Sequence, residues 1–367
     1  MSRLSVGRPN VMNKALFMQR VEQILESKYL TNDGPFVKNL ENQICSLFEV
    51  RHCVAVANAT LGLEILLSAL KIKGEVITPS FTFVATAHAI KRAGAEPVFC
   101  DVSLPSLCAS RDLIEPKITA RTSAILAVNL YGGLCDLQSL SELSAKHKLP
   151  LIYDSAHSLG TKWKGRWTGS FGDAEVFSLH GTKFINGFEG GLIVTNNGQL
   201  AQQCALLRNF CFTGYDQVSG IGTNAKLSEI HAAMALTNLE HIDELIAKNK
   251  EVYGCYKRLL PDEAQLMQYD CDVEPNYQYV VVMLPPHCRD EVQEAMLKRG
   301  VFARKYFYPG VHQFDCYRQN GLVLAVTEDV AQRALCLPTG QDITEHDVRF
   351  VCTTLTEAVE DVLRVRQ

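Results

Sequence analysis

The sequence predicts an α/β protein with a large, mostly parallel seven-stranded sheet domain and a small C-terminal α+β domain. Three observations predict this fold. Short apolar runs alternate with helical patterns early in the chain, which indicates parallel strands with helices on both faces of one sheet, an α/β/α arrangement. A Gly-rich stretch then joins two apolar runs directly. After a long helical pattern, the remaining elements have the character of a smaller α+β unit.

The apolar runs that we expect to be strands of the large sheet are short and bounded by polar or turn-forming residues. Helical patterns over residues 61–70, 83–92 and 137–147 separate several of them, as parallel pairing requires. The seven expected strands are residues 53–57, 75–78, 97–102, 123–130, 149–153, 175–179 and 191–195.

The last two expected strands are joined by the Gly-rich stretch 181–190, in which a long crossover helix does not fit. We therefore expect strand 191–195 to lie antiparallel to its neighbours. A helix predicted over residues 227–250 closes this half of the chain. The expected domains are residues 1–245, which include the N-terminal segment, and residues 246–367.

The smaller unit is predicted from four elements: strands at 277–284 and 300–304, and helices at 289–299 and 344–365. Two domains of unequal size favour a ligand cleft between them.

Composition excludes several classes of protein. The chain of 367 residues is 47% hydrophobic, with a formal net charge of −4, which does not favour a nucleic-acid partner. It has no apolar run of membrane-spanning length and no secretory signal, so we expect a cytoplasmic protein without a membrane partner. Its 13 cysteines are scattered without C-x-x-C spacing, and we expect neither a metal site nor disulfides.

The turn after the first strand is a candidate phosphate site. Asn58, Ala59 and Thr60 open a helix, where unpaired backbone N–H groups and the helix dipole attract anions. Thr60 as an ordinary helix cap is an equally good interpretation of this turn alone.

A carboxylate follows the strand at 149–153. Asp154 at a buried strand end is costly unless it is paired. It can cap the next helix, or it can face a protonated ring nitrogen of a cofactor. His157, three residues later, is by itself more typical of an ordinary hydrogen-bonded histidine than of a ligand.

A lysine follows the strand at 175–179. Burial lowers the pKa of a lysine and makes its amine a nucleophile and a base, so Lys183 among glycines is a candidate catalytic residue. A surface lysine in a flexible loop is the commoner meaning of such a residue taken singly.

The combination of three motifs favours a catalytic role for Lys183 over a surface position. A phosphate turn, the aspartate Asp154 and the lysine Lys183 occur in that order, and all three would project from the same edge of one sheet. Pyridoxal 5′-phosphate needs a phosphate cradle, a carboxylate for its pyridine nitrogen and a lysine for its aldehyde. The sequence therefore predicts a pyridoxal-phosphate enzyme.

The chain also resembles a known family along nearly its whole length. Its motifs are similar to those of the DegT/DnrJ/EryC/StrS sugar aminotransferases, which are fold-type I pyridoxal-phosphate enzymes. The segments that carry the resemblance are residues 30–35, 58–61, 79–86, 154–157, 177–183, 189–191, 222–229 and 304–309.

The resemblance implies a role for each matching residue. Lys183 would bind the cofactor as a Schiff base and move the proton, and Asp154 would pair with the pyridinium. Ala59, Thr60 and Ser178 would bind the phosphate. The resemblance also implies that Phe83 stacks on the cofactor ring, unless it is a plain core aromatic, and that His157 lies near the phenolic oxygen.

Three further roles concern the partner subunit and the substrate. Asn224 resembles the residue that reaches across a dimer to the partner's phosphate, which implies a homodimer with shared active sites. Tyr306 and His312 are candidates to line the sugar pocket. The chain departs from the family pattern at Ser155, His157, Gly181 and Gly310, which affects the substrate side more than the catalytic groups.

The predicted reaction is transamination of a nucleoside-diphosphate keto-6-deoxysugar, with dTDP-4-keto-6-deoxyhexose as the expected acceptor and L-glutamate as the donor. A 3-keto sugar is the nearest alternative. Some relatives carry histidine in place of the lysine and act as dehydratases, and Lys183 argues against that outcome. Two non-enzymatic alternatives are a sensor or regulator of this fold and an inactive scaffold. The first would need an added DNA-binding segment, and the second would not need both Lys183 and Asp154, so we favour an enzyme.

Overall fold

The computed structural model describes residues 4–319 and 321–366. A seven-stranded sheet forms the large domain, and its strand order is β2-β10-β9-β6-β5-β3-β4. The predicted fold class is confirmed, and each predicted strand of the large sheet is present. The strands are β2 (His52–Val56), β3 (Gly74–Pro79), β4 (Ala95–Cys100), β5 (Thr122–Val128), β6 (Leu151–Asp154), β9 (Ala174–Ser178) and β10 (Gly191–Thr195).

One strand of this sheet runs against the others. β10 pairs antiparallel with both β9 and β2, whereas the pairs β3–β4, β3–β5, β5–β6 and β6–β9 are parallel. The antiparallel direction predicted for residues 191–195 is therefore confirmed. Its physical cause is the short connection after β9, which has no room for a crossover helix.

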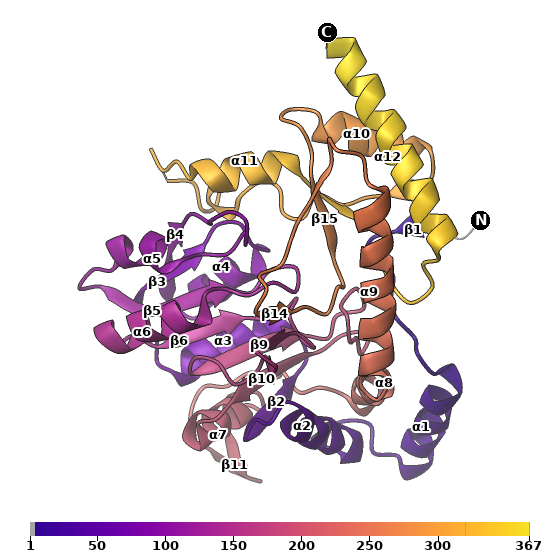
Figure 1. The fold of residues 1–367 in the computed structure, drawn as a ribbon. Helices are drawn as coiled ribbons and strands as arrows, with labels where there is room; N and C mark the ends of the chain where they lie inside the picture. The colour runs from indigo at the N-terminus through magenta and orange to yellow at the C-terminus, as the bar shows by residue number, and fades with distance from the viewer. Residues whose placement is uncertain (1–3, 320, 367) are drawn as a thin grey trace.

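Helices cover both faces of the sheet (Figure 1). Alternate strand residues such as Val54, Val76 and Val176 pack with α3, α4 and α7, and the other set packs with α2 and α8 or with α6. Burial on both faces explains why the strands read as continuous apolar runs. These helices are α2 (Pro35–Leu47), α3 (Ala59–Ala69), α4 (Ala85–Arg92), α6 (Leu137–His147), α7 (Gly198–Leu207) and α8 (Glu229–Leu239).

The expected helix over 227–250 is in fact two helices. α8 ends at Leu239, and α9 (Ile242–Leu259) begins after Glu240 and His241. α9 starts in the core of the large domain with Leu245 and ends in the second core with Val252. A domain boundary near residue 245 stays a prediction.

The second core belongs to the small domain, which we define as the later half of α9, the three-stranded sheet β13-β15-β17 and the helices that cover it. The terminal helix α12 lies along α10 in Figure 1. The remaining elements of this domain are α10 (Arg289–Lys298), α12 (Glu345–Arg366), β13 (Gln265–Leu266), β15 (Val280–Met283), β16 (Val301–Phe302) and β17 (Ala334–Leu337).

The start of the described chain also belongs here. β1 (Leu4–Ser5) pairs parallel with β16, and Leu4 is buried in the core of the small domain. The first strand therefore lies apart from the large domain, in which we expected the N-terminal segment. Its neighbour in sequence, α1 (Lys14–Ser27), contacts α8 of the large domain.

The other elements are short. A two-stranded sheet, a three-stranded sheet, two 3₁₀ turns and two further helices complete the described fold. They are α5 (Arg111–Ile114), η1 (Glu115–Lys117), β7 (Lys162–Trp163), β8 (Arg166–Trp167), β11 (Phe212–Gly214), β12 (Gln217–Val218), β14 (Val273–Glu274), η2 (Val311–Gln313) and α11 (Ala325–Arg333). Among the described helices, none combines the length and the apolar character that a membrane span requires.

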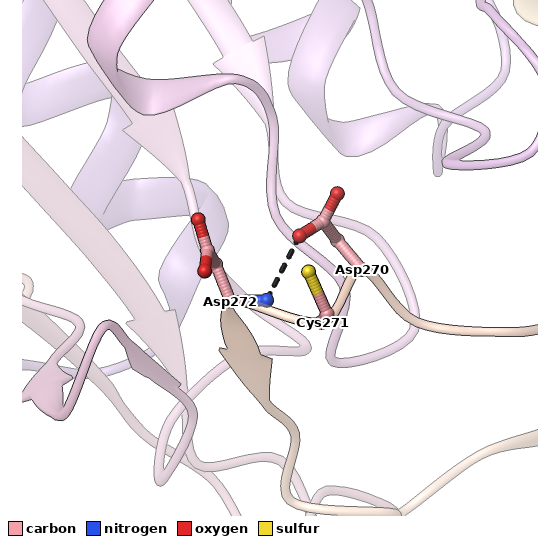
Figure 2. Close-up of side chains that lie close together, drawn as sticks. All are labelled: Asp270, Cys271 and Asp272. Carbon is pink, nitrogen blue, oxygen red and sulfur yellow. Dashed lines mark hydrogen bonds between the residues drawn. The ribbon is translucent and has the colours of Figure 1, made fainter.

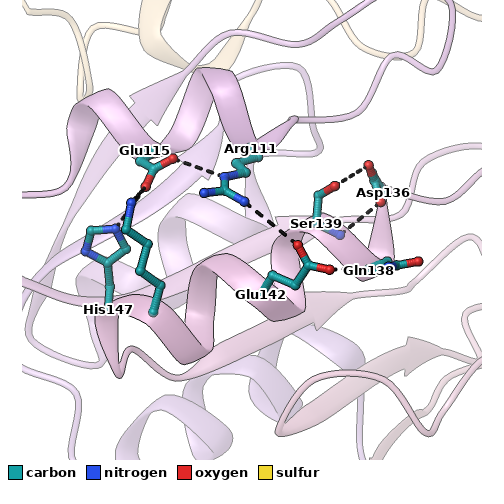
Figure 3. Close-up of polar contacts among 8 residues, drawn as sticks. Arg111, Glu115, Asp136, Gln138, Ser139, Glu142 and His147 are labelled. Atoms are coloured by element: carbon teal, nitrogen blue, oxygen red, sulfur yellow. Dashed lines mark hydrogen bonds and ion pairs between the residues drawn. The ribbon is translucent and has the colours of Figure 1, made fainter.

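A charged network ties α5 and η1 to α6 on the surface (Figure 3). Glu115 accepts hydrogen bonds from Lys146 Nζ at 2.6 Å, His147 Nε2 at 3.2 Å and Arg111 Nε at 3.0 Å. These donors, Lys146 foremost, lower the pKa of Glu115 to about 2. Because the network is open to solvent, screening limits its effect on stability.

Candidate active site

The carboxyl ends of β6 and β9 bring three of the predicted residues together. Asp154 ends β6, His157 follows in the next turn, and Lys183 follows β9. The two strands are parallel neighbours, with Asp154 in register with Val176. Parallel strands deliver their following residues to one edge of a sheet, so the alternation of strands and helices is what places these groups in one site.

Asp154 is buried, with 6% of its surface exposed. Its Oδ2 accepts a hydrogen bond from Thr86 Oγ1 at 2.7 Å, and its Oδ1 accepts one from the backbone N–H of Ala156 at 3.2 Å. Burial raises the pKa of Asp154, while Thr86, Ala156 and the nearby Lys183 oppose that rise. The carboxylate is thus held by donors in a site where an unpaired charge would be costly.

Lys183 lies partly buried beside this carboxylate. Removal from water lowers the pKa of Lys183 to about 8, and the negative charge of Asp154 limits the fall. Its Nζ lies 3.5 Å from the hydroxyl of Tyr279. An amine with this pKa is neutral in a sizeable fraction of molecules near neutral pH, as a nucleophile or a base must be.

His157 is buried next to both groups. The backbone N–H of Tyr131 donates to His157 Nδ1 at 3.2 Å, so the neutral ring carries its proton on Nε2. Burial, with the nearby Lys183, lowers the pKa of His157 well below its ordinary value. The site therefore contains a neutral imidazole with one N–H to donate.

The predicted phosphate turn starts α3. Asn58 caps this helix, since its side chain accepts from the backbone N–H of Leu61 at 2.9 Å. Among the described residues, the N–H groups of Ala59 and Thr60 have no recorded acceptor, as is usual in the first turn of a helix. A Cβ on Gly191 would lie 2.6 Å from Ala59 N, so glycine in β10 lets this turn approach the strand.

The other cofactor candidates lie around this edge. Ser178 is the last residue of β9, and its Oγ accepts from the backbone N–H of His180 at 3.3 Å. Phe83 is 57% exposed, and its ring lies 5.8 Å from that of Phe307. An exposed aromatic ring beside a polar site is available to stack on a flat ligand.

Asn224 lies beside the end of β2, because the next residue, Ala225, accepts from the backbone N–H of Ala57 at 2.7 Å. Asn224 is exposed, and its Oδ1 accepts from Lys226 Nζ at 2.6 Å. No recorded hydrogen bond among the described residues joins it to Asp154, His157 or Lys183. The side chain of Asn224 is thus engaged by Lys226, and not by these three groups of the same chain.

The two substrate candidates have different surroundings. Tyr306 is partly exposed, its ring stacks on Phe307 at 5.3 Å, and its carbonyl accepts from the Tyr131 hydroxyl. His312 is only 3% exposed. Its Nδ1 pairs with Ser80 Oγ at 2.6 Å and its Nε2 with Glu328 at 3.1 Å, so both ring nitrogens are engaged within the protein.

Sequence reasoning missed several residues of this site. Thr86 falls in a recognised motif, but only the structure shows that its hydroxyl meets Asp154. Tyr131, Tyr279 and Phe307 surround His157, with ring centroids 5.9, 4.4 and 5.8 Å from that of the imidazole. Aromatic residues in or next to apolar strands give no signal in the sequence that separates them from ordinary core residues.

One cluster outside this site has the residue types of a metal site (Figure 2). Asp270, Cys271 and Asp272 lie together, and all three are exposed. Asp270 Oδ1 accepts the backbone N–H of Asp272 at 2.9 Å, which makes the group a closed turn. Exposed acidic turns of this kind are common, and we assign no ion to it.

Comparison with known proteins identifies one family and several relatives that cover nearly the whole chain. Residues 12–356 match the model of the DegT/DnrJ/EryC1/StrS aminotransferase family. The chain is 33% identical over 359 residues to dTDP-4-amino-4,6-dideoxy-D-glucose transaminase of Shigella dysenteriae, covering 96% of this chain and 98% of that one.

Solved structures share the fold. DesI, determined in the presence of its TDP-sugar product, has a TM-score of 0.94 and 40% identity, covering 100% of this chain and 96% of its own. A sugar aminotransferase of Streptococcus pneumoniae, Spr1654 in its PMP form, has a TM-score of 0.92 and covers 98% of both chains. At 22% identity, this second likeness shows the fold alone.

Proposed function

Because the chain belongs to the DegT/DnrJ/EryC1/StrS aminotransferase family, we propose that it transfers the amino group of L-glutamate to a nucleoside-diphosphate keto-6-deoxysugar. The acceptor that we propose is dTDP-4-keto-6-deoxyhexose. The name of the Shigella dysenteriae relative and the TDP-sugar bound by DesI support this choice. The observation that carries the proposal is the meeting of Lys183 and the buried Asp154 at one sheet edge.

Pyridoxal 5′-phosphate is the proposed cofactor, and the residues present fit it. Its aldehyde takes up the amino group, and its protonated ring accepts the electrons released when a substrate C–H bond breaks. Lys183 Nζ would attach to the aldehyde carbon and Asp154 would face the ring nitrogen. The donors for the phosphate would be the N–H groups of Ala59 and Thr60, with the Thr60 and Ser178 hydroxyls.

Two further residues would orient the cofactor. His157 presents an Nε2–H, which suits an oxygen substituent on the ring, and Phe83 offers an exposed aromatic face. The hydrogen bond from Thr86 keeps the Asp154 carboxylate directed and charged. A fixed negative charge at this position favours a protonated ring nitrogen without any movement during the reaction.

Lys183 would also move the proton. With a pKa of about 8, its amine would be able to take a proton from the substrate carbon that bears the nitrogen and to deliver it to the carbon on the other side of that nitrogen at near-neutral pH. The partly buried surroundings keep bulk water away from that exchange. A lysine in open solvent, with its pKa above 10, would be protonated and unable to act as the base.

We propose a homodimer in which Asn224 reaches the phosphate site of the partner subunit. The same region exposes apolar side chains on the β11–β12 hairpin and the loop after it, including Tyr215 at 103% and Ile221 at 98% exposure. Apolar groups so fully exposed are typical of surfaces covered by another chain. They support an interface that includes this hairpin.

The proposed sugar pocket includes Tyr306, whose partly exposed ring lies beside Phe307 and Phe83. His312 contributes differently in this proposal. Its ring holds Ser80, and the backbone N–H of Val311 donates to the Ser80 carbonyl at 2.9 Å. His312 thus joins the segment after Tyr306 to the segment before Phe83, and it would position the pocket without contacting the sugar.

A cytoplasmic location belongs to the same proposal. All 13 cysteines are free thiols, which suits a reducing compartment. Cell fractionation of the producing organism tests this point directly.

The function is tested with purified protein, pyridoxal phosphate, glutamate and a panel of keto-sugar nucleotides. We expect a yellow protein whose colour borohydride removes, and an amino-sugar nucleotide identified by mass and NMR. Lys183→Ala should lose the reducible colour and at least about 1,000-fold of the rate. The control Lys164→Ala removes an exposed lysine paired with Asp272 and should change neither.

The same assay separates the rival reactions. Amination at C3 would identify a 3-keto acceptor, and a deoxygenated product without added nitrogen would identify a dehydratase. A Lys183→Ala protein that keeps both colour and rate would refute the proposed function.

A further inference from the structure

Tyr279 is a buried phenol whose hydroxyl points at the amine of Lys183. It comes from the segment just before β15, whereas Lys183 follows β9 of the large sheet. The hydroxyl lies 3.5 Å from Lys183 Nζ, and it is the one hydrogen-bond partner recorded for that amine among the described residues. Tyr279 is 5% exposed, so water has little access to this contact.

The position of Tyr279 is fixed from several sides. Its ring stacks on the imidazole of His157, with centroids 4.4 Å apart and an interplanar angle of 29°. Its carbonyl accepts a hydrogen bond from the hydroxyl of Tyr269 at 3.2 Å. The side chain of Asn276 donates to the carbonyls of His157 and Leu159 at 2.9 Å each, which holds the segment against the large domain. The phenol is therefore held at the lysine by contacts that do not involve its own hydroxyl.

Three titratable groups face Lys183: the carboxylate of Asp154, the imidazole of His157 and the phenol of Tyr279. Asp154 is engaged by Thr86 and Ala156, and the Nδ1 of His157 accepts from Tyr131. Burial keeps the phenol protonated, because it raises the pKa of Tyr279 well above the ordinary value. A neutral phenol oxygen can accept a hydrogen bond from an ammonium group, and such charge-assisted bonds are stronger than neutral ones.

We propose that Tyr279 is a positioning residue for Lys183. The Tyr279 hydroxyl accepts a hydrogen bond from the Lys183 ammonium group and fixes the position of the amine between proton transfers. This inference deepens the proposed function and rests on it, because the position of the amine matters only if Lys183 carries the cofactor. The expected result of losing the hydroxyl is an ammonium group that is less stabilised and less ordered. The amine would then deprotonate at lower pH and spend less time at the reacting carbon.

The test measures Lys183 in the cofactor-free protein by competitive labelling. Trace acetic anhydride acylates neutral amines only, and mass spectrometry of the peptide containing Lys183 gives the labelled fraction from about pH 6 to about pH 10. Wild-type protein should show a midpoint near the pKa of about 8. Tyr279→Phe, which keeps the ring and its stacking, should lower that midpoint by about one pH unit.

A matched control is available two residues earlier. Tyr277→Phe also removes one phenolic hydroxyl from this segment. The ring of Tyr277 packs against the ring of Tyr253, with centroids 5.2 Å apart, and not against His157. This variant should leave the Lys183 midpoint unchanged. In the cofactor-loaded enzyme, Tyr279→Phe should lower kcat by about 10-fold or more with KM within about twofold, since the loss concerns the chemical step.

The outcomes separate the inference from the proposed function. An unchanged midpoint in Tyr279→Phe overturns the role of Tyr279, even if the enzyme aminates keto-sugars. A lowered midpoint in a protein that aminates no keto-sugar supports the contact and refutes the proposed function. An equal shift in Tyr277→Phe would show a general effect on the segment and would also overturn the assignment.

Discussion

Three buried threonines lie close together in the sequence, and they differ in whether the side-chain hydroxyl has a hydrogen-bond partner. Thr86 Oγ1 donates to Asp154 Oδ2, and Thr82 Oγ1 lies 2.9 Å from Thr86 Oγ1 in a second hydrogen bond. Thr78 Oγ1 is buried and has no recorded partner among the described residues. The Thr86 hydroxyl stabilises the charge of Asp154. The Thr78 hydroxyl is removed from water without a compensating hydrogen bond, which destabilises the folded protein.

Thr86→Val should weaken the site. Valine keeps the shape of threonine and removes the donor to the Asp154 carboxylate, so the pKa of Asp154 should rise further above its ordinary value. We expect the cofactor dissociation constant to increase by about 10-fold, measured by equilibrium dialysis near neutral pH. Thr82 reaches the carboxylate only through the hydroxyl of Thr86, so Thr82→Val should increase the cofactor dissociation constant less than Thr86→Val does. An equal or larger increase in Thr82→Val would contradict the prediction.

Thr78→Val should stabilise the protein. The substitution removes an unsatisfied buried hydroxyl from β3 without creating a cavity, and the expected gain in unfolding free energy is about 1 kcal/mol. Urea denaturation of the cofactor-free protein measures it. A loss of stability would indicate that the hydroxyl has a partner, such as an ordered water.

The residues of the site could be predicted from sequence to different extents. Asp154 and Lys183 could be proposed because they occur in order with a phosphate turn, and alternating strands and helices deliver all three to one edge of a sheet. Thr86 and Tyr279 could not be proposed, because their roles depend on which distant segment lies opposite them. His312 looked like a pocket residue, and its two hydrogen bonds inside the protein could be seen only in three dimensions.

At the scale of elements, the large sheet was the most predictable part of the fold. Strands buried on both faces are continuous apolar runs, and all seven were expected within a few residues of their observed bounds. Several helices were not expected. α2, for example, begins at a cap supplied by Glu229, which accepts from the backbone N–H groups of Phe36 and Val37 at 2.7 and 3.0 Å from a site nearly two hundred residues away.

β9 contains a second buried carboxylate. Glu175 is fully buried, and it accepts hydrogen bonds from Ser155 Oγ at 2.7 Å and from the backbone N–H groups of Gly169 and Phe171 at 2.6 and 3.0 Å. Burial outweighs these donors and raises the pKa of Glu175 from 4.5 to about 7. The unfolded chain therefore releases this proton at lower pH than the folded protein does.

Glu175→Gln should change how stability depends on pH. In wild-type protein, this group costs nothing below about pH 4.5, and its cost grows as the pH rises to about 7 and stays constant above that. Glutamine cannot ionise, and its carbonyl can still accept the two backbone N–H groups. The variant should therefore gain about 2–3 kcal/mol relative to wild type between about pH 5 and about pH 8. Urea denaturation at several pH values measures the gain; a difference that does not vary with pH would contradict it.

At the scale of the whole molecule, one helix connects two cores. α9 begins among large-domain residues such as Leu245 and ends among small-domain residues such as Tyr256. Figure 1 shows this helix running from beside α8 toward the small domain. Asn276 then brings the chain back against the turn that holds His157. The small domain thus supplies Tyr279 to a site in which Asp154 and Lys183 come from strand ends of the large sheet.

The proposed dimer gives a prediction at this scale. We expect the protein to sediment as a dimer at micromolar concentration, since Tyr215 and Ile221 in the β11–β12 region are almost fully exposed, as is typical of residues that another chain covers. Replacing both Tyr215 and Ile221 with serine should raise the dimer dissociation constant by about 100-fold. Analytical ultracentrifugation measures it, with Val323→Ser, an exposed apolar residue elsewhere, as control. A wild-type protein that is monomeric throughout would contradict the proposal.

The pairing of β1 with β16 has a consequence for the order in which the protein matures on the ribosome. Leu4 emerges long before Val301, its partner in the ladder. The strands of the large sheet, and the helices α7 and α8 that pack on them, are all made before Val301, so that domain can assemble while Leu4 is still unpaired. The small domain therefore closes last, and until then its earliest strand is an apolar edge that nascent-chain chaperones can recognise.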